Sequence, residues 1–274
     1  LSGCEVYDPA ANTWSAVTSL PTARLGMASG VIAETLYAVG GSFGRGESDV
    51  NQAFTPPAGA PAPRIDPDGI VSDASYAGGR IAAGAMVVIN GAGLSAGAVQ
   101  ASEPSRLPAS LGGVQVTFNG VSAPLLFVSP ARILAQVPWE VAGASSIAVQ
   151  VVANGVASGI ATVAGVPAAP AVFAMDPSGR GQAVANLATG QVAAAAGSVL
   201  LPARPAQPGD VLTLYATGLG PVTNTPPSGS PPLDGAPSKT TTVPRVIIGG
   251  AAATVLSSGL AAGMVGVYEV QVLV

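Results

Sequence analysis

The sequence predicts an all-β protein, and three observations carry that prediction. The 274 residues include 36 glycines and 25 prolines, which favour turns over long helices. Short apolar runs follow one another closely, and the clearest of them alternate with polar residues at the period of a half-buried strand. Asn119-Gly120 and Asn154-Gly155 each follow such a run, and Asn-Gly readily adopts the positive φ angles of a tight hairpin turn. Many short strands separated by turn residues are typical of β-sandwiches.

The strand pattern is clearest at residues 112–141. Apolar and polar residues alternate from Val114 to Phe118 and stop at Asn119 and Gly120, which predicts a strand that ends in a hairpin. Pro124 lies in the next apolar run, 123–128, and indicates an edge or a bulge because proline cannot donate to a sheet ladder. Further apolar runs and a second Asn-Gly turn follow at 133–137, 147–152, 154–155 and 160–163.

Composition argues against several classes of function. The net charge is −4 and the single lysine is Lys239, so the basic face that nucleic acid or an anionic membrane surface requires is missing. The sequence contains no histidine, the commonest general base and metal ligand. Its single cysteine, Cys4, cannot form an intrachain disulfide and is interpreted as a small buried hydrophobe. We expect no catalytic, cofactor-binding or metal-binding residue and no cofactor, and no pattern identifies a ligand-binding residue.

The mean hydropathy of +0.52 raises the question of a membrane span. The longest uncharged stretch, residues 141–175, contains Asn154, Pro167, Pro170 and several glycines. A spanning helix needs about 20 predominantly apolar residues in a row. We therefore expect no membrane span.

Residues 1–41 resemble the kelch repeat of β-propellers. The matching text is EVYDPAANTW, LPTAR and ASGVIAETLYAVGG. The resemblance implies the outer strands of one blade followed by the first strands of the next, hence two half-blades. The positions that carry it are Tyr7, Asp8, Pro9, Trp14, Arg24, Leu36, Tyr37, Gly40 and Gly41. Independently, the apolar runs 28–32 and 35–39 predict a hairpin. Because propellers have typically 4–8 blades, we expect this segment to be the C-terminal end of a longer propeller.

Residues 42–68 are predicted to be a linker. Four prolines, Pro56, Pro57, Pro61 and Pro63, favour a semi-extended chain without core residues. The DPDG text at 66–69 resembles the start of a calcium loop, but an EF-hand requires further ligands and a Glu at the twelfth position. We interpret 66–69 as a Pro-Asp turn.

Most of residues 69–274 resembles an uncharacterised C-terminal domain family that recurs in secreted Solibacter-type proteins. The matching text includes GIVSDASYAGGRIAAGAMVVINGAGL, LPASLGGVQVTFNGVSAPLLFVSPARILAQVPWEV and PGDVLTLYATGLGPV. The resemblance carries no established activity over to any residue. The pattern predicts two immunoglobulin-like sandwiches of the IPT/TIG kind, at 69–164 and 165–274.

An internal repeat supports the pair of sandwiches. Residues 84–94 align with 209–219, at an offset of 125 (209 − 84), and residues 116–120 and 136–137 align with later segments at offsets of 130 (246 − 116) and 135 (271 − 136). Slowly growing offsets indicate one fold with short loop insertions, among them residues 222–240.

The second copy ends about 25 residues (163 − 138) before its equivalent of Val163 in the first. It is therefore expected to lack the last two strands and to expose a strand edge and part of its apolar interior. Either the sequence is cut short, which we favour because the start of the chain also looks incomplete, or a partner chain supplies the strand.

Two motifs in one segment resemble ligand or catalytic sites. Gly91, Gly93 and Ala96 fit a dinucleotide fingerprint, but the required helix is interrupted by Pro104 and Pro108, and no acidic residue follows at the ribose position. Residues 93–97 fit the G-x-S-x-G nucleophile elbow around Ser95, which needs a histidine that the chain lacks. We interpret both as glycine-rich turns.

A third motif, Ser238 followed by Lys239, suggests a Ser–Lys dyad. Adjacent residues of an extended chain point to opposite faces, so direct activation of the serine is not expected. We interpret Lys239 as a solvated loop residue.

These observations predict a non-catalytic protein, secreted or on the cell surface. A propeller would recognise a protein or carbohydrate ligand, and the sandwiches would serve as stalk or adhesion modules. The signal peptide would lie outside this sequence. The alternative is that the sequence is the accessory C-terminal region of a kelch-propeller enzyme whose active site lies upstream of Leu1.

Overall fold

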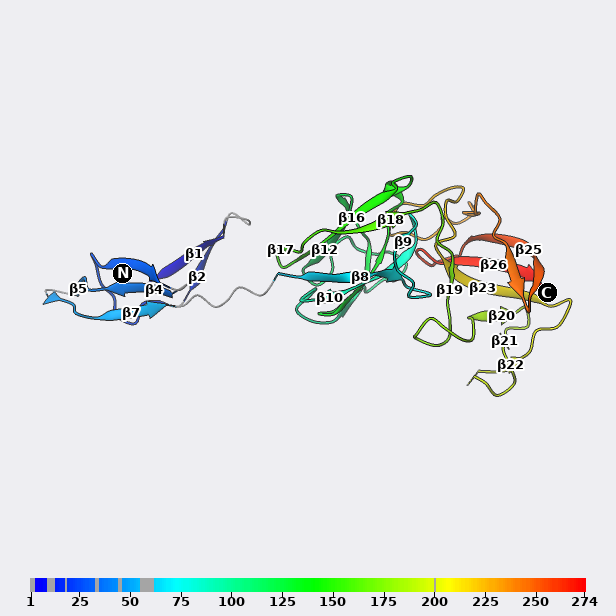
Figure 1. Cartoon of the computed structure of the whole chain (residues 1–274), viewed down its shortest axis with the longest axis horizontal. Helices are drawn as coiled ribbons and strands as arrows, with labels where there is room; N and C mark the ends of the chain where they lie inside the picture. Colours follow the sequence, from blue (N-terminus) through cyan, green and yellow to red (C-terminus); the bar gives the residue numbers. More distant parts are fainter. Residues whose placement is uncertain are drawn as a thin grey trace. The chain divides into compact units, whose positions relative to one another are not determined.

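The computed structural model describes residues 3–8, 13–17, 19–32, 35–43, 46–54, 62–199 and 201–274. It confirms the all-β prediction, with 47% of residues in strands. Among the described residues the single helical element is a 3-10 turn, η1 (Trp139–Val141). The chain divides into two compact units, Leu1–Pro61 and Ala62–Val274, and Figure 1 labels several strands of each.

The first unit is built from antiparallel hairpins. β1 pairs with β2, and β3, β4 and β7 form a three-stranded sheet. The predicted hairpin over 28–39 is confirmed, with Ala28 opposite Val39 and Ile32 opposite Thr35. The strands of this unit are β1 (Cys4–Asp8), β2 (Thr13–Val17), β3 (Ala28–Ile32), β4 (Thr35–Val39), β5 (Ser42–Phe43), β6 (Gly46–Glu47) and β7 (Asn51–Phe54).

Arg24 organises the three-stranded sheet of the first unit. Its side chain is buried, and its guanidinium donates to the carbonyl oxygen of Val50 at 2.7 Å and to Oε1 of Gln52 at 2.6 Å. A third bond, of 3.3 Å, runs to the carbonyl oxygen of Ala38. Arg24 thereby holds the chain around β7 against β4. The linker prediction for 42–68 is therefore wrong for β7, which belongs to a sheet. Pro9, named above for the kelch resemblance, and Pro56, Pro57 and Pro61, named for the linker, lie outside the described residues.

Tyr7 and Trp14, the two aromatic side chains of the first hairpin, are exposed rather than buried in a core. Trp14 and Tyr7 face each other across β1 and β2 with ring centroids 5.2 Å apart, and Trp14 is 67% exposed. Cys4 is only partly buried, so the expectation that it is a buried hydrophobe is wrong. A two-stranded hairpin offers too little surface to cover its side chains on both faces.

The second unit begins with a complete β-sandwich. One sheet has the order β11-β14-β15-β10-β8 and the other β13-β12-β16-β18-β9, with β17 on β16. The strands are β8 (Arg64–Ser72), β9 (Arg80–Ile81), β10 (Met86–Ala92), β11 (Val99–Gln100), β12 (Val114–Phe118), β13 (Val121–Ser122), β14 (Leu125–Val128), β15 (Arg132–Gln136), β16 (Ser146–Ala153), β17 (Val156–Ala157) and β18 (Ala161–Gly165).

The core of this sandwich follows from strict alternation along its strands. In β16, Ile147, Val149 and Val151 are buried while the residues between them are partly exposed. Phe118 of the neighbouring strand β12 and Ile133 of β15, in the other sheet, are fully buried in the same core. Each such side chain contributes about 1.5–3 kcal/mol when it leaves water.

Both predicted Asn-Gly turns are confirmed. Asn119 and Gly120 have φ angles of 49° and 81°, and Asn154 and Gly155 have 49° and 84°. The side chain of Asn119 also bonds to β16, because its Oδ1 accepts from the amide of Ala148 at 2.8 Å. The turn residue therefore closes one hairpin and fixes the next strand at the same time.

Residues 66–69 form a bulge inside β8 instead of a separate turn. Ile70 faces Ile89 of β10 and Ile65 faces Gly91, so four residues lie opposite one. Asp68 adopts a φ angle of 53°, as such a bulge requires. The sandwich accordingly begins at Arg64, before the predicted boundary at 69. Next to Pro124, the predicted irregularity is found as a register shift between Leu125 and Phe127.

The second copy has one large sheet, with the order β22-β21-β20-β23-β26-β25-β24 and with β19 on β23. β25 pairs with β24 along its first half and with β26 along its second. In the first copy two separate strands make these pairings, because β13 pairs with β12 and β14 pairs with β15. The strands are β19 (Ala171–Val172), β20 (Ala185–Leu187), β21 (Val192–Ala193), β22 (Ala203–Arg204), β23 (Val211–Thr217), β24 (Val246–Ile248), β25 (Ala251–Leu260) and β26 (Tyr268–Leu273).

The aligned repeats correspond in space, with one correction. β23 is the counterpart of β10, and the glycines that flank the two strands, Gly84, Gly93, Gly209 and Gly218, all have positive φ. Met86 faces Gln136, whereas its counterpart Val211 faces Leu273, so the true offset of the last strand is 137 (273 − 136) rather than 135. A shift of two residues keeps the same side chains on the inner face.

Candidate functional site

The two sandwiches of the second unit are joined by buried hydrogen bonds. Thr217, at the end of β23, is 1% exposed. Its hydroxyl oxygen accepts from the amide of Met86 at 2.8 Å, and the hydroxyl donates to the carbonyl oxygen of Gly266 at 2.8 Å. The Thr217 side chain thus bonds to the start of β10 in the first sandwich and to the turn at Gly266 in the second.

A second buried link runs through Gln136. Its side chain is 1% exposed, and its Oε1 accepts from the amide of Gly229 at 2.7 Å. The carbonyl oxygen of Gly229 also accepts a hydrogen bond from the amide of Leu107 at 2.9 Å. Gly229 lies in the loop 222–240 of the second copy. The tip of that loop packs on the first sandwich.

Trp139 is held in the same region. Its amide donates to Oγ of Ser228 at 2.9 Å, and Ser228 donates in turn to Glu140 at 2.7 Å. The indole ring lies directly over Gly84, where a Cβ atom would overlap the ring. Gly266 allows a similar approach, since a Cβ there would come within 2.8 Å of the Met86 sulfur. Gly266 lets the two sandwiches meet closely, whereas Gly84 makes room for the indole ring within the first sandwich.

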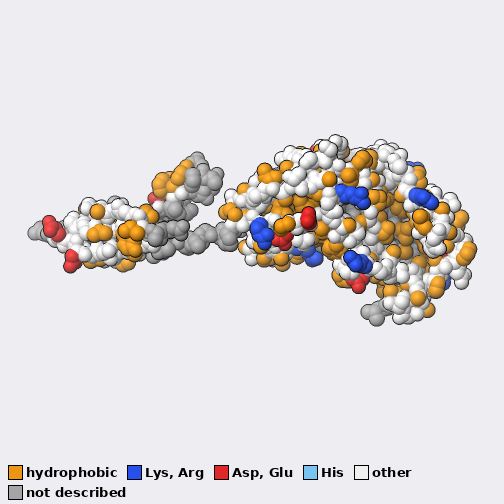
Figure 2. All heavy atoms as spheres, viewed as in Figure 1, with side chains coloured by type: hydrophobic (Ala, Val, Ile, Leu, Met, Phe, Trp, Pro, Cys, Tyr) orange, Lys and Arg blue, Asp and Glu red, His pale blue; other side chains and the backbone are white. Residues whose placement is uncertain are grey.

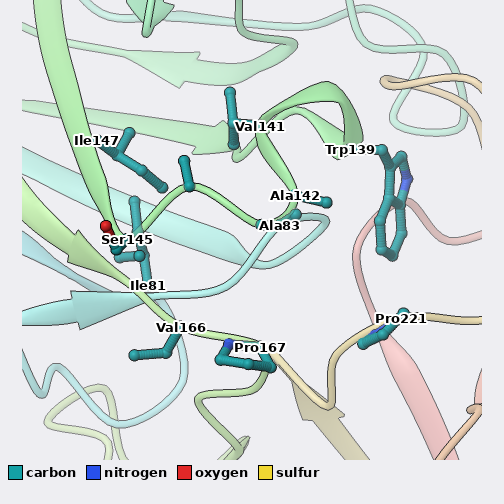
Figure 3. Close-up of a pocket in the computed structure, with 13 residues that line it drawn as sticks. Ile81, Ala83, Trp139, Val141, Ala142, Ser145, Ile147, Val166, Pro167 and Pro221 are labelled. Carbon is teal, nitrogen blue, oxygen red and sulfur yellow. The ribbon is translucent and has the colours of Figure 1, made fainter.

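An apolar cavity of about 310 Å³ lies beside this junction. Figure 3 shows Trp139 and Pro221 facing each other across one end, with Ile81, Val141 and Ile147 at the other. Ser145 is the one lining residue with a hydroxyl, and the lining carries no charged side chain. The cavity can hold a small apolar group and offers no pair of groups for acid–base chemistry.

The indole nitrogen of Trp139 is buried and has no hydrogen-bond partner. In Figure 3 it is turned away from the other labelled residues. It therefore does not supply a donor to the cavity.

A larger groove of about 460 Å³ lies on the inner face of the second copy. Leu212, Leu214 and Val270 contribute to its apolar lining, together with Val246 and Ile248 of β24. The other lining residues are Pro170, Val172, Gln182, Ala183, Ala185, Ala193, Ala206, Ala216, Leu219, Pro244, Arg245 and Ile247. The first copy buries the equivalent surface completely, so this groove is the main difference between the repeats.

The dinucleotide-like and elbow-like glycines have structural roles. Gly91 lies where a Cβ would overlap the carbonyl oxygen of Arg64, so glycine is needed for the close approach of β8. Residues after Ala96 continue into β11 instead of a helix, and the pyrophosphate-binding helix N-terminus is therefore missing at this position. Ser95 donates to the carbonyl oxygen of Gly97 at 2.6 Å, which closes a local turn.

The other residues that the sequence analysis considered as site candidates also lack a reactive partner. Ser238 is buried and donates to the carbonyl oxygen of Asn224 at 2.9 Å, while Lys239 is exposed. Asp66 and Asp68 line one shallow hollow. The described residues contain no group of three or more His, Cys, Asp or Glu side chains that could hold a metal ion.

Charged side chains are sparse on the face of the second unit that Figure 2 shows. The strongest pair joins Arg204 of β22 to Asp210 through two hydrogen bonds of 2.7 and 2.8 Å. The hydrogen bond from Arg204, with a further one from the amide of Gln207, lowers the pKa of Asp210 to about 2. The pair ties β22 to the start of β23.

The residues of the junction were not identified from the sequence. Gln136 is the one polar residue between apolar neighbours near the end of β15, which is a weak signal for a buried amide. The sequence repeat aligned it with Gln271, but in the structure the counterpart of Gln136 is Leu273, and Gln271 bonds to Glu269 at 3.0 Å. The second copy therefore has no glutamine at the position of Gln136.

Comparisons with known proteins agree with the architecture of the first sandwich. A search of curated proteins found no match to the chain. Among the described residues, none of the helical structure is long and apolar enough to cross a membrane. IPT/TIG domains are non-catalytic immunoglobulin-like folds that are common in extracellular and adhesion-type proteins and often mediate protein interactions. Residues 70–164, which build the first sandwich, match the family model of the IPT/TIG domain.

Proposed function

We propose that residues 62–274 act as a stiff, non-catalytic spacer of a secreted or cell-surface protein. The observation that carries the proposal is the buried junction. Thr217 and Gln136 bond across it, and each is 1% exposed. Breaking such bonds costs about 1–3 kcal/mol for each buried group left without a partner, so independent motion of the sandwiches is disfavoured.

The chemistry of the surfaces supports the same proposal. The cavity and the groove are lined mainly by apolar side chains. The sequence contains no histidine, and Ser95 and Ser238 are occupied by local hydrogen bonds. The match of 70–164 to the IPT/TIG domain supports an extracellular or adhesive setting.

The proposal extends to the first unit through its sequence resemblance. Kelch-like half-blades at 1–41 would belong to a propeller that recognises a protein or carbohydrate, with the sandwiches as its stalk. The resemblance of 69–274 to the Solibacter-type secreted family supports the same setting.

The spacer proposal is tested by calorimetry of the full chain. Two rigidly joined sandwiches should unfold in one transition, separate from that of the first unit. Replacing both junction side chains, Thr217→Val and Gln136→Met, should split this transition into two. Two well-separated sandwich transitions in the wild-type chain would show that the modules move independently and would overturn the proposal.

A further inference from the structure

The sequence contains three Asn-Gly pairs, which begin at Asn90, Asn119 and Asn154. Asn-Gly is especially prone to spontaneous deamidation, because glycine has no side chain to hinder the attack of its amide nitrogen on the neighbouring carboxamide. The reaction requires that this nitrogen and the asparagine side chain are free to meet. The three pairs differ in how the fold holds these two groups.

The Asn90 pair lies inside a sheet and is held at both reacting groups. The amide of Gly91 donates to the carbonyl oxygen of Ala131 at 3.0 Å, so the attacking nitrogen is engaged. Nδ2 of Asn90 donates to the carbonyl oxygen of Gly69 at 3.3 Å. Because β10 lies between β8 and β15, freeing this pair requires the sheet to open. We expect no reaction at Asn90 in the folded protein.

The other two pairs occupy closely matched hairpin turns. Asn119 and Asn154 both have a φ angle of 49°, and the glycines that follow have 81° and 84°. Valine comes next in both turns, and both asparagines are exposed. Each turn leads into a two-residue strand, β13 or β17, that pairs with one neighbour among the described strands. Backbone conformation, sequence and exposure therefore do not distinguish the two turns.

Their side chains do distinguish them. Oδ1 of Asn119 accepts from the amide of Ala148 at 2.8 Å, and its Nδ2 donates to the carbonyl oxygen of Ser146 at 3.3 Å. These two bonds tie the carboxamide of Asn119 to β16. Attack by the amide of the following glycine would have to break both of them.

The carboxamide of Asn154 is not tied in this way. Asn154 takes part in the hydrogen bonds of the described residues through its main-chain amide, which donates to the carbonyl oxygen of Gly113 at 2.9 Å, and not through its side chain. Its Oδ1 only lies over Gly113, where an added Cβ would come within 2.3 Å of it. The amide of Gly155 donates to none of the described residues. Both reacting groups are therefore available at this turn.

We propose that Asn154 is a site of spontaneous modification, at which the folded protein deamidates to aspartate and isoaspartate. The amide nitrogen of Gly155 loses its proton and bonds to Cγ of Asn154, the Cγ–Nδ2 bond breaks, and ammonia leaves with that proton. Water then adds to either carbonyl of the cyclic imide and opens it. One ammonia is released and one water is consumed, so the reaction needs no oxidant or reductant.

The modification changes one end of the first sandwich. Each product adds one negative charge at Asn154. Isoaspartate also lengthens the main chain by one carbon atom, which a two-residue turn cannot accommodate with Ala153 opposite Val156. β17 should therefore separate from β16 in the isoaspartate form. Beyond it, the hydroxyl oxygen of Ser158 still accepts from β16 at 3.0 Å, which confines the change to this hairpin.

The test incubates the folded full chain in mildly alkaline buffer and follows each Asn-Gly pair by peptide mapping and mass spectrometry. One net hydrogen bond corresponds to a rate change of up to about tenfold, so the two bonds of Asn119 should make it react about ten- to a hundredfold more slowly than Asn154. The control is the same chain in urea, where the two matched sequences should react at similar rates.

Two outcomes of this experiment overturn the proposal. The first is that Asn119 reacts as fast as Asn154, or faster, in the folded chain, which would show that the side-chain bonds do not protect it. The second is that Asn154 stays unmodified in the folded chain while it reacts in urea, which would show that the fold protects both turns.

Two matched variants locate the reaction independently. Asn154→Asp and Asn119→Asp each remove one carboxamide and keep a residue type that tolerates positive φ. Thermal melts check that both variants remain folded. Release of ammonia by the folded chain should nearly vanish in Asn154→Asp and should continue at the wild-type rate in Asn119→Asp. Undiminished release from Asn154→Asp places the reaction elsewhere and overturns the proposal.

Discussion

Replacing Thr217 by valine removes the hydroxyl at the centre of the junction without changing the shape of the side chain. Two buried main-chain groups lose their partners, the amide of Met86 and the carbonyl oxygen of Gly266. Each buried group without a partner costs about 1–3 kcal/mol, so the free energy of unfolding of the second unit should fall by about 2–6 kcal/mol. That is a large part of the about 5–15 kcal/mol typical of a folded domain.

The assay is urea denaturation followed by the fluorescence of Trp139, which lies at the junction. A Trp14→Phe background removes the other tryptophan, which belongs to the first unit. The matched control is Thr217→Ser, which keeps the hydroxyl and loses one methyl group, worth about 1 kcal/mol. Hydrogen exchange of the Met86 amide should accelerate in the valine variant alone.

The result that would refute this reasoning is equal stability of the valine and serine variants. The hydroxyl would then contribute nothing beyond its volume, and the contact between the sandwiches would rest on apolar packing. A valine variant that is less stable but keeps slow exchange at Met86 would likewise show that the hydrogen bond is not the cause.

Two further predictions concern the junction and the β22 anchor. Gly84→Ala should destabilise the second unit by about 2–4 kcal/mol, because the added Cβ meets the Trp139 ring and the φ angle is positive. The control is Gly143→Ala, where φ is also positive but the added Cβ meets open space. Equal melting temperatures of the two variants would contradict the clash. Because the folded pKa of Asp210 is lowered from 3.8 to about 2, its bond to Arg204 stabilises the fold above about pH 4 and is lost as the pH falls toward 2. Asp210→Asn should flatten the melting temperature between pH 4 and 2, and an unchanged slope would disprove the contribution.

Local patterns in the sequence determined much of the fold. Alternation predicted β12, the Asn-Gly pairs predicted both turns, and the glycine-flanked repeat predicted that β23 matches β10. These features depend on neighbouring residues, because side chains alternate along a strand and only a few residue types tolerate positive φ. For the same reason, the register of β26 was predicted wrongly by two residues, since a shift of two preserves the pattern.

The groove of the second copy was predicted in part from the sequence. The repeat predicted that the second copy has no counterpart of β16 and β18 and has a free strand edge. It also predicted that part of the apolar interior of the second copy is exposed, but not how the remaining strands pair around this edge. The tertiary structure shows that β25 spans both halves of the fold while the floor under β24 stays open.

The junction was decided by tertiary structure alone. Thr217 meets Met86 across 131 residues of sequence, and Gln136 meets Gly229 across 93. A threonine at a strand end and a glutamine in a strand have many ordinary surroundings, so residue type says little about such partners. What makes them structural is burial, since a polar group removed from water must find a partner wherever the fold brings one. That partner depends on how two whole sandwiches pack, and no local pattern encodes it.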